Sequence, residues 1–267
     1  MDIRLTQQPL SSLMVDAIVV PLFAPEEGEL PDAEVEGWSG GLLAELLESG
    51  EFKGKLGSTT LLHRPAGLEV KRLLLVGAGE REKLTTGALR RIAAIAVRTL
   101  KEKGVRGIAF RSIGNLDAEQ TAQALAEGAR MGAFEVDAYK TEGRAEGSID
   151  ELILALPARA QAGVDRGLAV AAGQEYARTL ANEPGNHLTP TVLAARAREM
   201  AAETGLEIEV FDKTRLEQMG AGALLGVAKG SAEPAVMIVL RYKPAQTPSS
   251  DVHLGLVGKA VTFDTGG

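Results

Sequence analysis

Short apolar runs and longer segments of helical periodicity alternate along the chain. The run RLLLVG at residues 72–77 is almost wholly apolar, which predicts a strand buried on both faces of a sheet. Residues 85–103 follow with Leu89, Ile92 and Leu100 at helical spacing, which predicts a helix. The remaining predicted elements in this part are strands at 3–5, 17–22, 59–63, 107–112 and 151–156, and helices at 42–47 and 118–133. Strands that alternate with helices in this way indicate an α/β fold.

The pattern changes after Pro157, where a long amphipathic helix is predicted at 162–181 as a connector between two domains. The elements predicted beyond it are a helix at 189–204, strands at 207–211, 236–242 and 253–257, and a glycine-rich turn at 220–230. These strands predict a parallel sheet with an unpaired edge, so we expect the second domain to be incomplete. The chain is therefore divided into residues 1–158, 159–188 and 189–267.

Composition narrows the class of protein. The 267 residues are 45% hydrophobic and 24% charged, as in globular proteins. No stretch approaches the roughly 20 apolar residues of a transmembrane helix. The net charge of -7 argues against nucleic acid as a partner. One predicted helix region carries several basic residues, and we expect them to form a solvated face: Arg90, Arg91, Arg98, Lys101 and Lys103.

Cysteine is absent, which excludes disulfides, thiolate metal sites and cysteine nucleophiles. The first residues of the chain show no basic region followed by a long apolar run, so no signal peptide is predicted. We therefore expect a cytoplasmic location.

Lys259 and Asp264 are the strongest candidates for chemistry, at the end of an apolar run. The carboxylate of Asp264 could bridge two divalent cations, and Gly266 and Gly267 let the backbone turn sharply beside it. Lys259 could ligate a metal only as the neutral amine, because an ammonium group has no lone pair. The spacing alone favours a simpler interpretation, in which Lys259 is a strand-end lysine in solvent and Asp264 caps a turn.

Three other patterns carry less weight. Residues 264–266 match the Asp-Thr-Gly triplet of aspartic proteases, but that chemistry needs two carboxylates and the chain has no second triplet. The GAG at 77–79 follows a strand as in a dinucleotide-binding loop, yet Glu82 stands where the third glycine is required. The histidines show no ligand spacing, so they are predicted to lie at the surface or to pack structurally: His63, His187 and His253.

Four segments resemble motifs of the leucyl (cytosol) aminopeptidase family, and they occur along the chain in the same order as in the family. VGKAVTFDTGG at 257–267 is similar to the first metal-binding motif of that family, and MGAGALLGV at 219–227 to its glycine-rich segment. NEPGNHLTP at 182–190 resembles the signature at the join between the two domains, and LLVGAG at 74–79 resembles a weaker pattern of the N-terminal domain. Near that join, we expect Glu183 and Asn186 to hydrogen-bond the backbone of the linker rather than to take part in catalysis.

The resemblance implies a macro-like N-terminal domain in residues 1–158, a helical connector and domain join in 159–188, and the beginning of the α/β catalytic domain in 189–267. It implies an enzyme that releases N-terminal residues, preferably leucine, from peptide substrates and assembles as a hexamer. Two divalent cations, zinc or manganese, would activate water and bind the substrate amine. By motif, Lys259 is a metal ligand and Asp264 bridges the cations. Ala260 stands where glycine is usual, with little expected effect.

In the family the motif continues to a catalytic lysine, further carboxylate ligands and an arginine, none of which is among these 267 residues. With Lys259 and Asp264 alone, a stable dimetal centre is not expected, and these residues by themselves are predicted to be inactive. The alternative is a non-catalytic binding or assembly module with a macro-like domain. A DNA-binding module would show salt-dependent binding to duplex DNA, and a nucleotide binder would respond to ADP-ribose.

Overall fold

The structure, a computed structural model, describes residues 1–26, 28–136, 139–143, 147–244 and 253–262. Contacts within the chain divide it into two units, Met1–Arg178 and Thr179–Gly267. The boundary lies inside one long helix. The domain limits at 158 and 188 derived from the sequence remain predictions.

The first unit is built on a six-stranded sheet of order β1-β6-β5-β2-β4-β3. All neighbouring strands are parallel except β3, which pairs antiparallel with β4 at one edge. The strands are β1 (Asp2–Thr6), β2 (Ala17–Phe23), β3 (Thr59–His63), β4 (Arg72–Gly79), β5 (Gly107–Phe110) and β6 (Glu151–Ala155). Each was predicted to within a few residues, and β3 has the predicted bounds.

Both faces of this sheet are buried, because successive side chains of a strand point to opposite faces. In β2, Ala17 and Val19 contribute to one core cluster, whereas Ile18 and Val20 contribute to the other. The same alternation continues along β4, β5 and β6. The continuous apolar runs in the sequence therefore correspond to strands covered on both sides, as predicted for residues 72–77.

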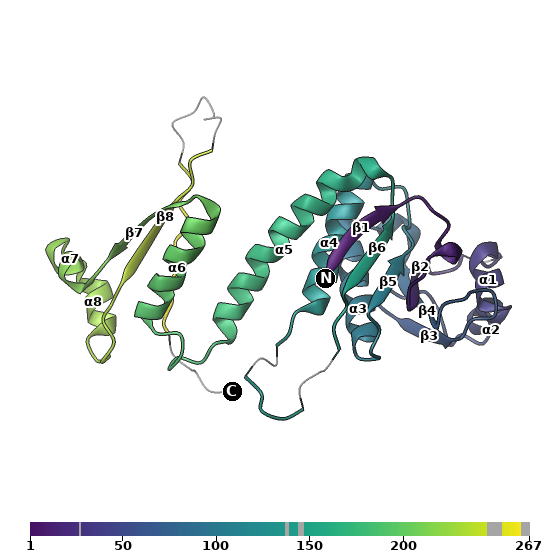
Figure 1. Ribbon diagram of the computed structural model, residues 1–267, viewed down its shortest axis with the longest axis horizontal. Helices are drawn as coiled ribbons and strands as arrows, with labels where there is room; N and C mark the ends of the chain where they lie inside the picture. The colour runs from purple at the N-terminus through teal and green to yellow at the C-terminus, as the bar shows by residue number, and fades with distance from the viewer. Residues whose placement is uncertain (27, 137–138, 144–146, 245–252, 263–267) are drawn as a thin grey trace. The chain divides into compact units, whose positions relative to one another are not determined.

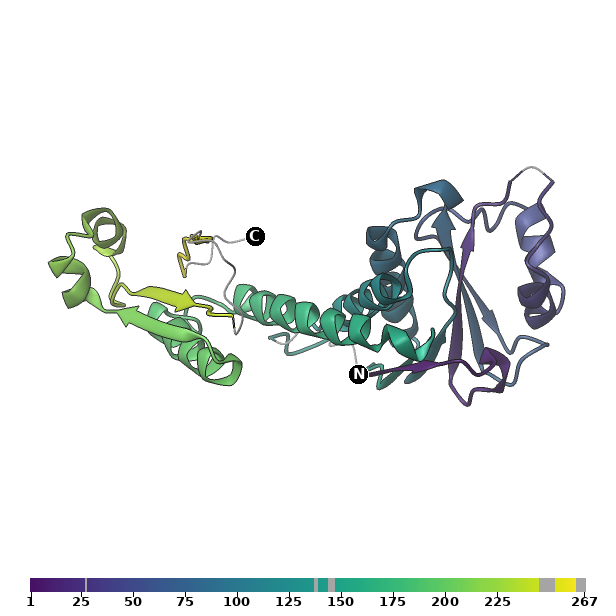
Figure 2. The ribbon, with the colours of Figure 1, turned by 90° about the horizontal axis from the view of Figure 1, so that it is seen from above.

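Helices cover the two faces separately (Figures 1 and 2). α3 (Thr86–Lys101) and α4 (Ala118–Ala133) pack on one face, and α1 (Ala33–Ser39) and α2 (Leu42–Glu48) on the other. The described part of the unit also contains three short 3-10 turns: η1 (Leu10–Ser12), η2 (Arg81–Lys83) and η3 (Ala158–Ala160). α1 was not predicted, although Asp32 caps its start and Gly40 ends it in the left-handed conformation.

α5 (Gln161–Asn182) packs along α4 in the first unit. The backbones come close at Gly163, where a Cβ atom would lie 2.1 Å from the carbonyl oxygen of Glu119. Further along, Arg166 pairs with Glu119 at 2.6 Å, and Arg178 lies 4.0 Å from the ring centroid of Phe134. α5 is thus anchored to α4 over most of its length.

The second unit contains a two-stranded antiparallel sheet of β7 (Glu207–Phe211) and β8 (Met237–Arg241). Its helices are α6 (Pro190–Thr204), α7 (Lys213–Gln218) and α8 (Gly222–Ala228). α6 begins as predicted, with Thr189 as N-cap and Pro190 in the first turn.

Three predictions for the second unit were wrong. The sheet is antiparallel rather than parallel, because the chain returns through α7 and α8 to pair β8 against β7. The predicted turn at 220–230 contains α8, since alanine, leucine and valine outweigh its two glycines. Residues 253–257 form no strand, because none of the strands in the described part of the chain pairs with them.

The basic residues of α3 do not form one solvated face, contrary to prediction. Arg90 pairs with the buried Glu127 of α4 at 2.5 Å, and the buried Lys101 pairs with Glu135. Arg91 and Arg98 are exposed as expected. Among the helices described, none combines the length and the apolar character needed to cross a membrane.

Candidate functional site

Lys259 lies in the segment of residues 253–262, which has neither helix nor strand, and its side chain is exposed. Asp264 lies outside the described residues, as do the two glycines after it. The roles of Lys259 and Asp264 as metal ligands therefore remain predictions. Within the described ranges, no group of three or more histidine, aspartate or glutamate side chains is placed to hold a metal ion.

Glu183, in the segment 182–190, is held by an ion pair. Its side chain is 2% exposed and pairs with the guanidinium group of Arg196 on α6. The second carboxylate oxygen, Oε2, is buried without a hydrogen-bond partner among the described atoms. Glu183 thus fixes the turn that precedes α6 through a side chain rather than through the linker backbone. Asn186 is exposed in the same turn.

The histidines lie apart from one another along the described chain, and each is exposed. His63 ends β3, His187 lies in the turn before α6, and His253 lies in the segment near Lys259. This matches the prediction that they are surface residues.

A cleft in the first unit was not predicted from the sequence. It has a volume of about 590 Å³ and lies at the carboxyl ends of β2, β4 and β5. Its walls come from the loop between β2 and α1, the turn η2 after β4, and the loop between β5 and α4. Parallel strands bring their carboxyl ends to one edge of a sheet, so residues distant in sequence meet there.

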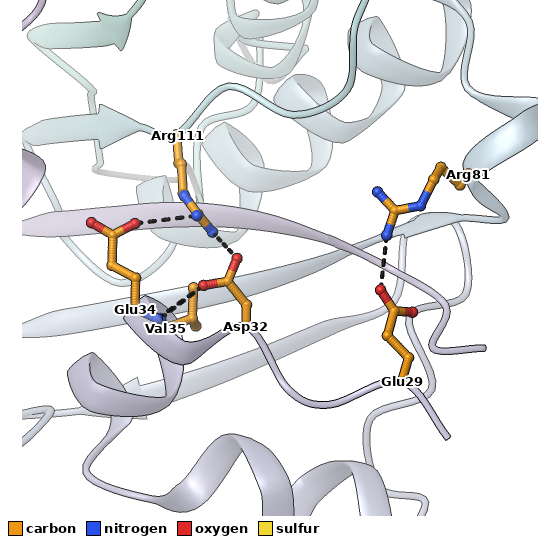
Figure 3. Close-up of polar contacts among 6 residues, drawn as sticks. All are labelled: Glu29, Asp32, Glu34, Val35, Arg81 and Arg111. Carbon is orange, nitrogen blue, oxygen red and sulfur yellow. Dashed lines mark hydrogen bonds and ion pairs between the residues drawn. The ribbon is translucent and has the colours of Figure 1, made fainter. Parts of the chain in front are cut away.

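Two ion-paired arginines lie in this cleft (Figure 3). Arg111 reaches Asp32 at 2.7 Å and Glu34 at 3.1 Å, and Arg81 reaches Glu29 at 2.9 Å. Both guanidinium groups also lie against aromatic rings: Arg81 is 4.5 Å from the centroid of Phe23, and Arg111 is 5.9 Å from that of Trp38. These contacts hold both guanidinium groups at the edge of the sheet.

Asp32 remains a carboxylate at neutral pH. Partial burial raises its pKa, but hydrogen bonds from Arg111 and from the backbone N–H groups of Val35 and Glu34 outweigh burial. The net effect holds the pKa of Asp32 below its ordinary value. The cleft therefore carries fixed charges of both signs.

The sequence contained a partial signal for this cleft. Arg81 and Arg111 each follow a buried strand closely, where side chains of a parallel sheet meet at one edge. Glu29 and Asp32 lie in a loop without a recognised motif, so their partners were not predictable from spacing.

Comparison with protein families gives two matches. The N-terminal domain of the cytosol aminopeptidase family matches residues 19–143, and the catalytic domain of the same family matches residues 175–267. Together the two matches span well over half of the chain.

Curated relatives agree. A probable cytosol aminopeptidase of Solibacter usitatus is 44% identical over 100% of this chain and 53% of its own length. One of Alkaliphilus metalliredigens is 34% identical over 100% of this chain and 55% of its own length. The chain thus spans about half the length of the curated relatives it matches.

Solved structures show the same architecture. A mutant of tomato leucine aminopeptidase superposes with a TM-score of 0.81 at 22% identity, over 93% of this chain and 52% of the other. The bottromycin maturation enzyme BotP in complex with Mn superposes with a TM-score of 0.69 at 27% identity, over 87% of this chain and 46% of the other. At 22% identity, the likeness to the tomato enzyme concerns the fold alone. With both domain matches in chain order, the chain belongs to the cytosol aminopeptidase family.

Proposed function

We propose that this chain contributes the N-terminal domain and the first part of the catalytic domain of a metal-dependent aminopeptidase. Its substrates are peptides, from which it releases N-terminal residues with a preference for leucine. The complete enzyme is a cytoplasmic hexamer with two divalent cations, manganese or zinc.

One observation carries this proposal. The match to the catalytic domain of the family extends over residues 175–267 and includes the motif with Lys259 and Asp264. The BotP structure was obtained with Mn, which agrees with a metal requirement in this group of proteins. The match to the S. usitatus protein, at 44% identity, covers the whole of this chain.

The donor set of this chain fits part of a metal centre. Asp264 supplies a carboxylate, a ligand suited to divalent cations, and Lys259 supplies an amine that is exposed in the described segment 253–262. When bound, two cations would polarise the scissile carbonyl and supply an activated water. Zinc takes about four ligands and a pair of cations takes more, so two side chains are too few. We therefore propose that residues 1–267 alone do not sustain activity.

A chimaera tests this proposal. Residues 1–267 are joined to the remaining part of the S. usitatus protein at the matching position, and release of leucine from a leucyl peptide is measured with and without Mn²⁺. We expect metal-stimulated activity in the chimaera and none in residues 1–267 alone. Lys259→Ala and Asp264→Ala should each reduce the activity about 100-fold or more, because each removes a ligand.

Lys229→Ala is the matched control, because Lys229 is another lysine of the second unit and lies after α8, outside the motif. It should leave the activity within about twofold of the parent chimaera. Full activity in the Asp264→Ala chimaera, or metal-stimulated activity of residues 1–267 alone, would overturn the proposal. Light scattering on the active chimaera tests the hexamer separately.

A further inference from the structure

The cleft of the first unit lies at a topological switch point of the sheet. β2 and β5 are neighbours and parallel, but the chain leaves them toward opposite faces. After β2 it continues to α1, and after β5 it continues to α4 on the other face. A crevice opens between such diverging connections, and ligands of open α/β sheets bind in it. The volume of about 590 Å³ is within the usual range of sites for small molecules.

The charged side chains that line the cleft are two arginines and two carboxylates, which pair with each other, while Glu34 outside the lining also pairs with Arg111. Arg81 faces Glu29 from η2, and Arg111 faces Asp32 from the end of β5 (Figure 3). All four side chains line the cleft and all are partly exposed, so water reaches them. A polar ligand can therefore approach these pairs without unfolding the loop that carries the two carboxylates.

The remaining walls are largely apolar. Leu84 and Leu116 line the cleft beside the charged pairs, and Leu30, between the two carboxylates, is 86% exposed there. Apolar side chains that together line a cleft favour an apolar group on its ligand. The ligand should thus combine charge with an apolar side chain.

The pairing of the charges restricts the class of ligand. Glu29 already neutralises Arg81, so an anion that binds Arg81 leaves the pair with a net negative charge beside Glu29. A cation that binds Glu29 leaves a net positive charge beside Arg81 in the same way. A zwitterion can enter between the two side chains, with its carboxylate on Arg81 and its ammonium group on Glu29, and the site remains neutral.

We propose that this cleft binds a small zwitterion with an apolar side chain, either a free amino acid or a dipeptide. Arg81 binds the carboxylate of the ligand and Glu29 binds its ammonium group. Arg111, held between Asp32 and Glu34, fixes the loop that carries Glu29. The proposal does not rest on peptidase activity, because every residue involved lies in the first unit, far along the chain from Lys259 and Asp264.

Titration calorimetry on the 267-residue chain tests the ligand class. EDTA is present throughout, so that a metal centre cannot contribute. L-leucine and leucyl-leucine are compared with isocaproate, which lacks the amine, and isopentylamine, which lacks the carboxylate. At least one zwitterion should bind, about tenfold or more tightly than either singly charged analogue. Tighter binding of L-leucine identifies the ligand as a free amino acid, and tighter binding of leucyl-leucine identifies it as a dipeptide.

Matched variants locate the site. Arg81→Gln and Glu29→Gln should each weaken zwitterion binding about tenfold or more. Lys83→Gln and Glu80→Gln remove a neighbouring ion pair that does not line the cleft, and they should change binding by less than about twofold. Circular dichroism melts of the four variants show whether each remains folded.

The proposal is overturned if isocaproate binds as tightly as leucine, or if the control variants weaken binding as much as the cleft variants do. It is also overturned if ADP-ribose binds while neither zwitterion does. Absence of binding by both leucine and leucyl-leucine also overturns it. None of these results bears on the chimaera assay, so the two proposals fail independently.

Discussion

The first unit, Met1–Arg178, and the second, Thr179–Gly267, differ in how they bury apolar surface. In the first, a sheet covered on both faces places leucine, isoleucine and valine in two large core clusters. In the described part of the second, half of the buried apolar residues are alanines of α6, and β8 is only half-buried to exposed. Burial of apolar area is the main source of folding stability. The recognisable motifs at 182–190, 219–227 and 257–267 nevertheless lie in the second unit.

This difference shows that recognisable sequence and stable structure are separate properties of this chain. The first unit has a complete core and an unexpected cleft but only a weak motif. The second has the strong motifs and the thinner core. Stability should therefore be far more sensitive to substitution in the first unit, whereas the proposed peptidase activity should depend on the second.

The largest expected contrast is between Leu75→Ala and Leu240→Ala. Leu75 is 0% exposed in β4, and its loss should cost about 2–5 kcal/mol, because a cavity remains in a packed core. Leu240 is 42% exposed in β8, so Leu240→Ala should lower the free energy of unfolding by less than about 1 kcal/mol. Trp38, the one tryptophan of the sequence, belongs to the same cluster as Leu75. Urea unfolding followed by its fluorescence reports the first unit, and far-UV circular dichroism reports both units. Equal midpoints of the two variants by circular dichroism would refute the contrast.

A second contrast concerns α5, which carries glycines in different surroundings. Gly163→Ala should destabilise the first unit by about 1–3 kcal/mol, because the added methyl group meets the backbone of Glu119 at 2.1 Å. At Gly173 a Cβ atom meets nothing within 4 Å. Gly173→Ala should therefore stabilise the helix by about 0.5–1 kcal/mol, since glycine is a poor helix former. Thermal melts of the two variants should move in opposite directions, and a shared direction would contradict close α4–α5 packing.

The first unit was largely predictable from the sequence because its elements bury residues at regular spacing. α4 has the predicted bounds, and the alternation along β2 and β4 follows from their placement between two helical layers. The second unit was less predictable. Residues 253–257 have the composition of a strand, but a strand requires a neighbour, and composition does not show whether one is present.

The candidate sites show the same limit. The motif with Lys259 and Asp264 was visible because its residues are close in sequence. The cleft was not, because Glu29, Arg81 and Arg111 meet only when three strands align their carboxyl ends. Local patterns identify local chemistry, whereas a site assembled from several loops depends on strand order.

A third contrast, smaller than the first two, tests the ion pair between Glu183 and Arg196 in the second unit. Arg196→Met leaves the carboxylate of Glu183 buried without its partner and should destabilise the second unit by about 1–2 kcal/mol. The cost is limited because the Arg196 side chain is 35% exposed, so water can replace part of the contact. Arg198→Met, on the exposed side of α6, is the matched control and should be nearly neutral. Amide hydrogen exchange of α6 measures both, and equal protection in the two variants would exclude a structural role for the pair.

The smallest expected effect is a pH dependence confined to the first unit. Asp16 accepts hydrogen bonds from the backbone N–H of Arg106 and Gly107 and pairs with Lys71. The Arg106 hydrogen bond is the largest cause that lowers the pKa of Asp16 below its ordinary value of 3.8, against a smaller opposing effect of burial. A lowered pKa in the folded state stabilises the fold above pH 3.8, and this stabilisation is lost as the pH falls through the folded-state value.

Asp16→Asn should therefore reduce the loss of stability between neutral pH and acid, because the amide does not titrate. Urea midpoints reported by Trp38 fluorescence, measured from neutral pH to below pH 3.8, give this slope directly. Asp165→Asn, at an exposed position of α5, is the matched control and should keep the slope of the parent chain. If both variants lose stability in acid as steeply as the parent chain, titration of Asp16 does not cause the acid sensitivity of the first unit. The acid sensitivity of the first unit would then arise from other carboxylates, with Asp32 at the cleft as the next to substitute, because its pKa is also lowered.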